Sequence, residues 1–359
     1  MNVNLRELEE ILDYTPVICK MNPISFIYLQ NVELVDENNL LFELDNPKFI
    51  HPLKRYIVNY PGNNLKYRFP GLELEHNPFT SEINYLLKDN LDYICKNCIT
   101  NKTVTEYIKN YIINSNIDVR TVLLLLVDGL SYEDTKHIGY KSIPVFIDSP
   151  SLTSRSFPLI INKGNLVLFF NSKGFNIMGF NYWDINKTEL STEIFSCFSN
   201  EQVTSVDSFN NILDNLYRKN LNKTFIQIVS MGLDQWCHKQ YEPPMIESFI
   251  TKLKENINAL TDVIPKPAFI FVISDHGILW KDRHKFEIIE NTGHKSNPSM
   301  RYFTKNEIGR KGIPYGKDDD FWVLEYPYIR RAFHKNEWGC HGGLSYEESF
   351  VPLIIVEVK

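Results

Sequence analysis

Six residues that can bind metal ions are spread over the last two thirds of the sequence. They are Asp128, Asp234, His238, Asp275, His276 and His341. Three carboxylates and three imidazoles form a mixed oxygen and nitrogen donor set, which suits zinc or manganese better than calcium or an iron–sulfur cluster. On a helix, Asp234 and His238 would share one face, because they are four residues apart, and both could then bind one ion.

Each of these residues also has a plainer interpretation when it is taken alone. Asp128-Gly129 after an apolar run is typical of a turn, and Asp234 and His238 are typical of a solvated helix face. Asp275-His276 fits a helix cap or turn, and His341-Gly342-Gly343 fits a flexible loop. The ordered conjunction of all four places, each next to a predicted strand, favours a single metal site over four unrelated surface features.

The elements that must position these residues are four largely apolar runs. They span residues 122–127, 225–229, 268–273 and 350–358. Such runs with little polar alternation predict strands covered on both faces, as in a parallel sheet flanked by helices. Helical patterns at 206–217 and 245–260 lie between them. The candidate ligands follow the strand ends or precede the last strand, and ligand sites of open α/β sheets lie at the carboxyl ends of strands.

The first third of the chain shows no comparable chemistry. Its pattern predicts helices near 5–12, 80–87 and 103–113 and short strands near 24–29 and 40–44. We therefore expect residues 1–117 to form a small mixed α/β domain of unknown role and residues 118–359 to form the domain that carries the chemistry.

Composition excludes several classes of protein. The chain has 359 residues, 43% of them hydrophobic, and a net charge of −6, so neither a disordered chain nor a uniformly basic nucleic-acid binder is expected. No secretory signal and no apolar stretch of membrane-spanning length is visible. Six scattered cysteines suit a reducing compartment. We expect a cytoplasmic protein that does not enter a membrane.

The sequence resembles the alkaline phosphatase superfamily and, within it, the PglZ branch. The resemblance rests on Val127-Asp128-Gly129, on Asp234 through His238, on Ser274-Asp275-His276-Gly277 and on His341-Gly342-Gly343-Leu344-Ser345. It covers residues 118–359. It implies a three-layer α/β core with a mostly parallel sheet flanked by helices.

The resemblance also implies a reaction centre with two divalent ions, zinc first and manganese as the alternative. Asp234, His238 and His341 would bind one ion, and Asp128, Asp275 and His276 the other. Thr153, in Pro150-Ser151-Leu152-Thr153-Ser154, takes the place of the nucleophile. Ser151 stands where the family usually has Thr, so the neighbouring serines at 151, 154 and 156 remain alternatives.

Arg301 resembles an arginine of the PglZ segment and would bind substrate phosphate, a role for which Arg155 competes. Residues 281–311 hold eight Lys or Arg against four acidic residues, a loop that is either simply solvated or in contact with a nucleic-acid backbone.

The resemblance implies a phosphodiesterase acting on a nucleotide or nucleic acid in bacterial anti-phage defence, as in BREX systems, with other defence proteins as partners. The alternatives are a phosphomonoesterase or phosphomutase on the same core, and a catalytically weak scaffold of a defence complex.

Overall fold

The computed structural model divides the chain into two compact units, residues 1–97 and 98–359. It describes strands β1 to β4 and residues 84, 87–88, 91–135, 138–183, 188–237, 242–289, 299–307, 312–315 and 320–359. The division falls before helix α5 (Val104–Asn114), whereas the sequence predicts it after that helix. The reason is that α5 buries Val104, Ile108 and Ile112 in the core of the second unit.

In the first unit the described strands form one parallel sheet in the order β2-β3-β1-β4. Their bounds are Val17–Cys19 for β1, Val32–Val35 for β2, Arg55–Asn59 for β3 and Glu73–Leu74 for β4. Helix α4 (Leu91–Asn97) ends this unit. The elements predicted at 5–12, 24–29 and 40–44, and nearly all of 80–87, lie outside the described residues.

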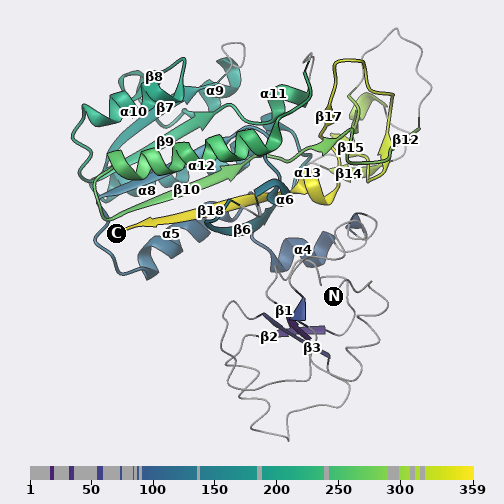
Figure 1. The fold of residues 1–359 in the computed structure, drawn as a ribbon, viewed down its shortest axis with the longest axis horizontal. Coiled ribbons are helices and arrows are strands. Elements are labelled where there is room, and N and C mark those ends of the chain that lie inside the picture. Colours follow the sequence, from purple (N-terminus) through teal and green to yellow (C-terminus); the bar gives the residue numbers. More distant parts are fainter. Residues whose placement is uncertain are drawn as a thin grey trace, which may run out of the picture. The chain divides into compact units, whose positions relative to one another are not determined.

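A seven-stranded sheet forms the centre of the second unit, in the order β6-β18-β10-β5-β9-β7-β8 (Figure 1). The bounds are Thr121–Val127 for β5, Lys141–Phe146 for β6, Asn176–Tyr182 for β7, Val203–Ser205 for β8, Thr224–Ser230 for β9, Ala268–Ser274 for β10 and Phe350–Val358 for β18. The four apolar runs of the sequence are thereby confirmed as strands. The last of them, β18, runs antiparallel to both β10 and β6, and the other neighbours are parallel.

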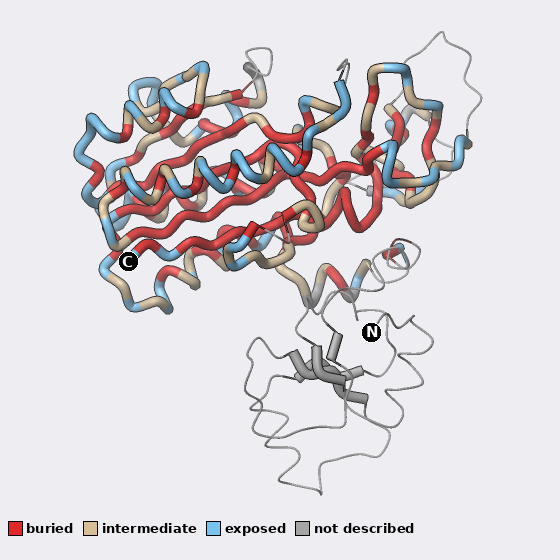
Figure 2. Tube along the Cα trace, viewed as in Figure 1, coloured by how far each residue is buried: buried red, intermediate tan, exposed pale blue. Residues whose placement is uncertain are grey.

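Helices cover both faces of this sheet, which confirms the expected three-layer α/β core. Buried side chains of α5, α7, α8 and α9 pack on one face and those of α10 and α12 on the other. The strands β5, β9, β10 and β18 between them are buried almost throughout, whereas β6, β7 and β8 are partly exposed (Figure 2). Alternate residues of β5 point to opposite layers, Leu124 into one core and Leu123 and Leu125 into the other.

The helices of the second unit vary widely in length. Besides α5 they are α6 (Tyr132–Thr135), α7 (Thr153–Ile161), α8 (Asn165–Ser172), α9 (Thr188–Ile194), α10 (Phe209–Tyr217), α11 (Asp234–Cys237), α12 (Ile246–Val263) and α13 (Tyr346–Ser349). The helices expected at 103–113, 206–217 and 245–260 are confirmed as α5, α10 and α12.

Short strands fill the segment between β10 and β18. They are β11 (Leu279–Trp280), β12 (Glu287–Ile288), β13 (Tyr302–Thr304), β14 (Ile313–Tyr315), β15 (Phe321–Val323), β16 (Tyr328–Ile329) and β17 (Gly339–Cys340). β13, β15 and β14 form a small antiparallel sheet. Within the described residues, no helix is both long and apolar enough to cross a membrane.

Candidate active site

The candidate ligands gather at one edge of the central sheet because β5, β9 and β10 are parallel neighbours. Asp128 follows β5 directly, and Asp275 and His276 follow β10. Asp234 begins α11 shortly after β9. The carboxyl ends of parallel strands lie at the same edge, so three segments far apart in the sequence supply side chains to one place.

Close backbone approach holds the Asp128 and Asp234 segments together. The Asp234 amide donates to the Asp128 carbonyl oxygen over 3.2 Å, and the Leu233 amide donates to that of Gly129. A Cβ atom at Gly232 would lie 2.0 Å from the Asp128 carbonyl oxygen, so only glycine permits this contact. Gly129, with φ of +76°, turns the chain away from β5.

Asp128, Asp275 and His276 form the first group of possible metal ligands, with one donor atom of each lying within 4.8 Å of the others. The His276 Nε2 atom lies 3.5 Å from Asp275 Oδ2 and 3.8 Å from Asp128 Oδ1. All three residues are buried, and Asp275 is fully inaccessible to solvent. Buried carboxylates at this spacing need positive charge to offset their desolvation and mutual repulsion, and a divalent cation supplies it.

Asp234, His276 and His341 form the second group. His341 Nε2 lies 3.1 Å from Asp234 Oδ1, and the rings of His276 and His341 stack with centroids 4.1 Å apart. The structure therefore brings together five of the six predicted ligands. The sixth, His238, lies outside the described residues.

Hydrogen bonds fix which nitrogen of each imidazole faces the site. The Nδ1–H of His276 donates to the Gly277 carbonyl oxygen over 3.0 Å, and the Nδ1–H of His341 donates to that of Ser151 over 2.8 Å. A carbonyl oxygen only accepts, so both rings are left with Nε2 directed at the carboxylates. This arrangement is typical of metal-binding histidines.

The two imidazoles have opposite pKa shifts. Burial, with repulsion from His341 as the next cause, lowers the pKa of His276 to about 4. Burial also disfavours the charged form of His341, but the Asp234 carboxylate outweighs it and raises the pKa of His341 to about 9. His276 is thus neutral at pH 7, with a ring nitrogen available as a ligand.

The Thr153 hydroxyl lies between these groups. Its Oγ1 atom is 3.3 Å from Asp128 Oδ1 and 3.1 Å from His276 Nε2. Thr153 is the first residue of α7, whose earliest amide bonds run from Arg155 and Ser156 to the Leu152 carbonyl oxygen. The amides of Thr153 and Ser154 precede these bonds and face the helix N-terminus, where anions are favoured.

The geometry separates Thr153 from the neighbouring serines. Ser151 is fully buried, where it donates to the Gly343 carbonyl oxygen and accepts from the Gly342 amide. Ser156 is also buried and hydrogen-bonds Ser149. Ser154 is exposed on the outer side of α7, facing a pocket that Thr153 does not line. Thr153 has the hydroxyl that contacts the carboxylate and imidazole groups.

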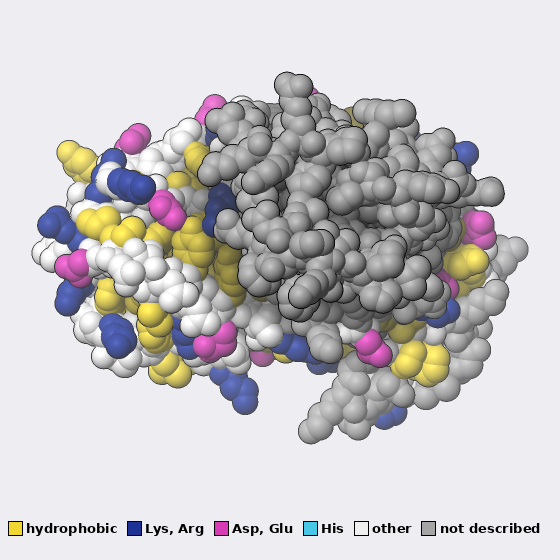
Figure 3. All heavy atoms as spheres, turned by 90° about the horizontal axis from the view of Figure 1, so that it is seen from below, with side chains coloured by type: hydrophobic (Ala, Val, Ile, Leu, Met, Phe, Trp, Pro, Cys, Tyr) yellow, Lys and Arg dark blue, Asp and Glu magenta, His cyan; other side chains and the backbone are white. Residues whose placement is uncertain are grey.

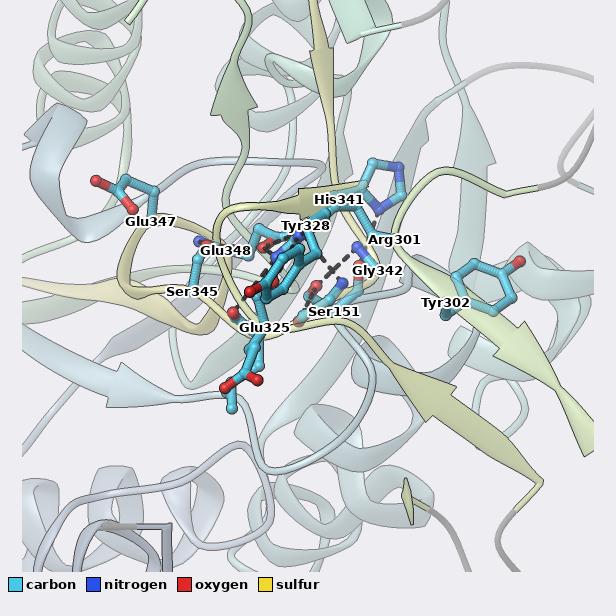
Figure 4. Close-up of polar contacts among 12 residues, drawn as sticks. Ser151, Arg301, Tyr302, Glu325, Tyr328, His341, Gly342, Ser345, Glu347 and Glu348 are labelled. Carbon is cyan, nitrogen blue, oxygen red and sulfur yellow. Dashed lines mark hydrogen bonds and ion pairs between the residues drawn. The ribbon is translucent and has the colours of Figure 1, made fainter. Parts of the chain in front are cut away.

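Arg301 does not have the geometry expected of a phosphate-binding residue. It is fully buried, and its guanidinium donates to both carboxylate oxygens of Glu348 and to the carbonyl oxygens of Glu325, Tyr328 and Leu344 (Figure 4). These bonds occupy all five N–H groups, so none remains for substrate. The side chain joins β13 to the loop after His341 instead.

Arg155, the competing candidate, is exposed. Its guanidinium carbon lies 4.7 Å from the centre of the Phe321 ring. It lines a pocket of about 690 Å³ together with Ser154 and Phe321.

The basic loop at 281–311 is described only in part, since 290–298 and 308–311 lie outside the described residues. On the face in Figure 3, the visible acidic and basic side chains are interspersed.

Two residues of the site escaped prediction from sequence. The Trp183 indole N–H donates to Asp128 Oδ2 over 2.7 Å. Glu348 accepts from the Gly343 amide and from the Ser345 hydroxyl, and so holds the loop that carries His341. Ser345-Tyr346-Glu347-Glu348 is a capping-box pattern and could have indicated Glu348, whereas no local pattern indicated Trp183.

No family model matches the sequence, and no curated protein matches it. Among solved structures, murine ectonucleotide pyrophosphatase/phosphodiesterase 5 is similar over 65% of this chain and 87% of its own, at 13% identity and a TM-score of 0.40. Phosphonoacetate hydrolase from Sinorhizobium meliloti 1021 is similar over 66% of this chain and 89% of its own, at 14% identity and a TM-score of 0.43. The C-terminal periplasmic domain of EcEptC from Escherichia coli, in complex with Zn, is similar over 46% of this chain and 66% of its own, at 11% identity and a TM-score of 0.30. These are similarities of backbone fold.

Proposed function

We propose that this chain is a metal-dependent hydrolase of phosphoric esters, a PglZ-like member of the alkaline phosphatase superfamily, and that it acts on phosphodiesters. One observation carries the proposal: the Thr153 hydroxyl contacts both Asp128 and His276, members of two overlapping groups of possible metal ligands. A hydroxyl at the edge of a carboxylate–imidazole cluster and at a helix N-terminus fits nucleophilic attack on phosphorus.

Asp128, Asp275 and His276 would hold one divalent ion. The neutral Nε2 of His276 has a single lone pair and serves only one ion. Asp234 and His341 therefore need another ligand, and His238, four residues after Asp234, is the one the sequence offers. Zinc, with manganese as the alternative, would neutralise charge on the phosphoryl group and lower the pKa of the Thr153 hydroxyl.

The protein's own groups have defined tasks in this reaction. Thr153 Oγ1 forms a bond to phosphorus as the bond from phosphorus to the leaving oxygen breaks. The hydroxyl proton passes through solvent to the leaving oxygen, so an alcohol departs and a phosphothreonine diester remains. The amides of Thr153 and Ser154 stabilise charge on the phosphoryl oxygens. Water then cleaves the Oγ1–phosphorus bond, which releases the phosphomonoester and restores the hydroxyl.

The biological setting rests on the motif resemblance alone. PglZ-like proteins are associated with anti-phage defence, so we propose a cytoplasmic role in a BREX-like system, with a nucleotide or nucleic acid as substrate and other defence proteins as partners.

Hydrolysis of bis(p-nitrophenyl) phosphate with added Zn²⁺ or Mn²⁺ tests the proposal. Thr153→Ala and Asp275→Asn are each expected to lower kcat/KM on the order of 10³-fold or more, and chelation to abolish turnover. The exposed helix residues Thr251 and Asp262 provide matched controls, Thr251→Ala and Asp262→Asn, which should keep full activity. Full activity of Asp275→Asn would overturn the mechanism.

The same assay separates the alternatives. Faster turnover of p-nitrophenyl phosphate than of the diester would favour a phosphomonoesterase. A purified protein without metal, with no turnover of either ester and no thermal response to Zn²⁺, would favour a scaffold.

A further inference from the structure

A pocket of about 690 Å³ lies beside the proposed nucleophile. Ser149 and Pro150, just before Thr153 in the sequence, and Ser154 and Arg155, just after it, line one side. Consecutive Cα atoms are about 3.8 Å apart, so these residues lie within a few residue lengths of Thr153. The pocket therefore adjoins the segment that carries Thr153 on its Ser154 and Arg155 side, and Thr153 itself does not line it.

Aromatic rings connect the candidate active site to this pocket. A Cβ atom at Gly342, next to His341, would lie 2.8 Å from Cδ1 of Tyr302, so the Tyr302 ring lies against that loop. In Figure 4, Tyr302 points away from the Arg301–Glu348 pair. The Tyr302 ring meets that of Phe321 edge-on at 5.5 Å, and the Arg155 guanidinium lies over Phe321. Two aromatic rings, Tyr302 and Phe321, therefore lie between the loop that carries His341 and the pocket.

The charges that line the pocket do not favour a second phosphate. Among the residues that the structure describes, the basic side chains of the lining are Lys102 and Arg155, and the acidic ones are Asp148, Glu193 and Asp320. Lys102 is already paired with Asp148 at 2.5 Å. The remaining charged groups are more acidic than basic, which disfavours an anion.

The rest of the lining is largely apolar and flat. Pro150, Pro158, Leu159, Pro314 and Phe321 supply apolar surface, and the hydroxyls of Ser149 and Ser154 add polar groups. Planar rings bind well against such walls, through stacking and cation–π geometry.

Building on the function proposed above, we propose that this pocket binds the ester group that stays on phosphorus, and that this group is a flat, uncharged aromatic or heteroaromatic ring. Arg155 and Phe321 form its wall and determine specificity. The substrate is then a small diester with one bulky ring. A polynucleotide, which carries a phosphate on every neighbouring unit, fits this pocket less well.

Two diesters with the same leaving group test this directly: methyl p-nitrophenyl phosphate and 2-naphthyl p-nitrophenyl phosphate. For the unmodified protein, kcat/KM should be at least about tenfold higher for the naphthyl ester, the size expected for one stacking contact. Phe321→Leu, which keeps apolar bulk without a ring, should remove most of this preference and change the methyl ester less than about twofold.

Arg155 gives a second, independent variant. Arg155→Gln should lower kcat/KM for the naphthyl ester alone if the residue is part of the wall, and for both esters alike if it binds the reacting phosphate. Tyr217, a highly exposed aromatic residue at the end of α10, provides the control Tyr217→Ala, which should leave both esters unchanged.

The outcomes separate the two proposals. No metal-dependent turnover of either diester would overturn the proposed function. Equal kcat/KM for both diesters, or equal losses on both in Phe321→Leu and Arg155→Gln, would overturn the pocket assignment and leave the hydrolase proposal standing.

Discussion

At the scale of single residues, the orientation of Asp128 depends on Trp183. The indole N–H binds Oδ2, so Oδ1 is the oxygen directed at Thr153 and His276. Trp183 also packs edge-on against Phe157 at 5.6 Å, which fixes the ring. Trp183 is therefore a positioning residue for a candidate ligand, in the way that metal sites use outer hydrogen bonds.

Trp183→Phe should keep the packing and lose the hydrogen bond. We expect about 10- to 100-fold weaker binding of Zn²⁺, measured by competition with a chromogenic chelator. The midpoint of urea unfolding in the presence of EDTA should stay close to that of the unmodified protein. Unchanged Zn²⁺ affinity would show that Asp128 needs no such support.

The sequence predicts best which residues lie together when each of them directly follows an apolar strand. Asp128, Asp275 and His276 follow apolar strands, and strand order alone brings them together. Arg301 was misjudged because its partner Glu348 is 47 residues away, and only the fold shows that the pair is buried. Trp183 was missed for the same reason, since its contact with Asp128 spans 55 residues.

At the scale of elements, the Arg301–Glu348 pair connects the start of β13 to α13 and to the loop after His341. Both side chains are fully inaccessible to solvent. A buried ion pair that loses one partner leaves an uncompensated charge in the interior. The position of His341 therefore depends on a pair outside the ligand set.

Glu348→Gln removes that charge at nearly constant shape. We expect it to lower the free energy of unfolding by about 3–5 kcal/mol, measured by urea denaturation. The matched control is Glu255→Gln, which breaks an exposed pair with Lys252 on α12 and should leave the unfolding midpoint unchanged. A loss of stability no larger than that of the control would contradict the role given to Glu348.

Strands are predicted from sequence where the run is largely apolar and are missed where polar residues or glycine recur within the run. β7 contains Asn176, Gly179 and Asn181, and β6 begins with Lys141 and Ser142, so neither resembles a strand buried on both faces. The sequence also does not predict that β18 runs antiparallel to its neighbours, because an apolar run has the same composition in either orientation.

At the scale of the whole molecule, the second unit begins at Cys98 and includes α5. Val104 and Ile108 are almost fully buried in the core on one face of the sheet. Removal of this helix would expose that face to water, at a cost of roughly 25 cal/mol for each Å² of apolar surface.

We therefore expect a fragment of residues 98–359 to unfold cooperatively on heating and a fragment of residues 118–359 to unfold at a clearly lower temperature or to aggregate. Circular dichroism during thermal unfolding measures the difference. Equal midpoints for the two fragments would place α5 outside the cooperative unit and support the later boundary.

The two groups of candidate ligands differ in how firmly the fold holds them. Asp128, Asp275 and His276 extend directly from β5 and β10, which pair along seven consecutive residues. Asp234 lies on the four-residue helix α11, and His341 on a loop. Ligands that extend from long paired strands move less than ligands on a short helix or a loop, even where hydrogen bonds anchor that helix or loop, so we expect the ion beside Asp234 and His341 to leave first. Dialysis against a weak chelator should therefore remove one equivalent of metal well before the other and leave a long-lived protein that holds a single ion. When the protein is loaded with Co²⁺ instead, the absorption spectrum of this half-loaded form should identify the remaining ion as the one beside Asp275.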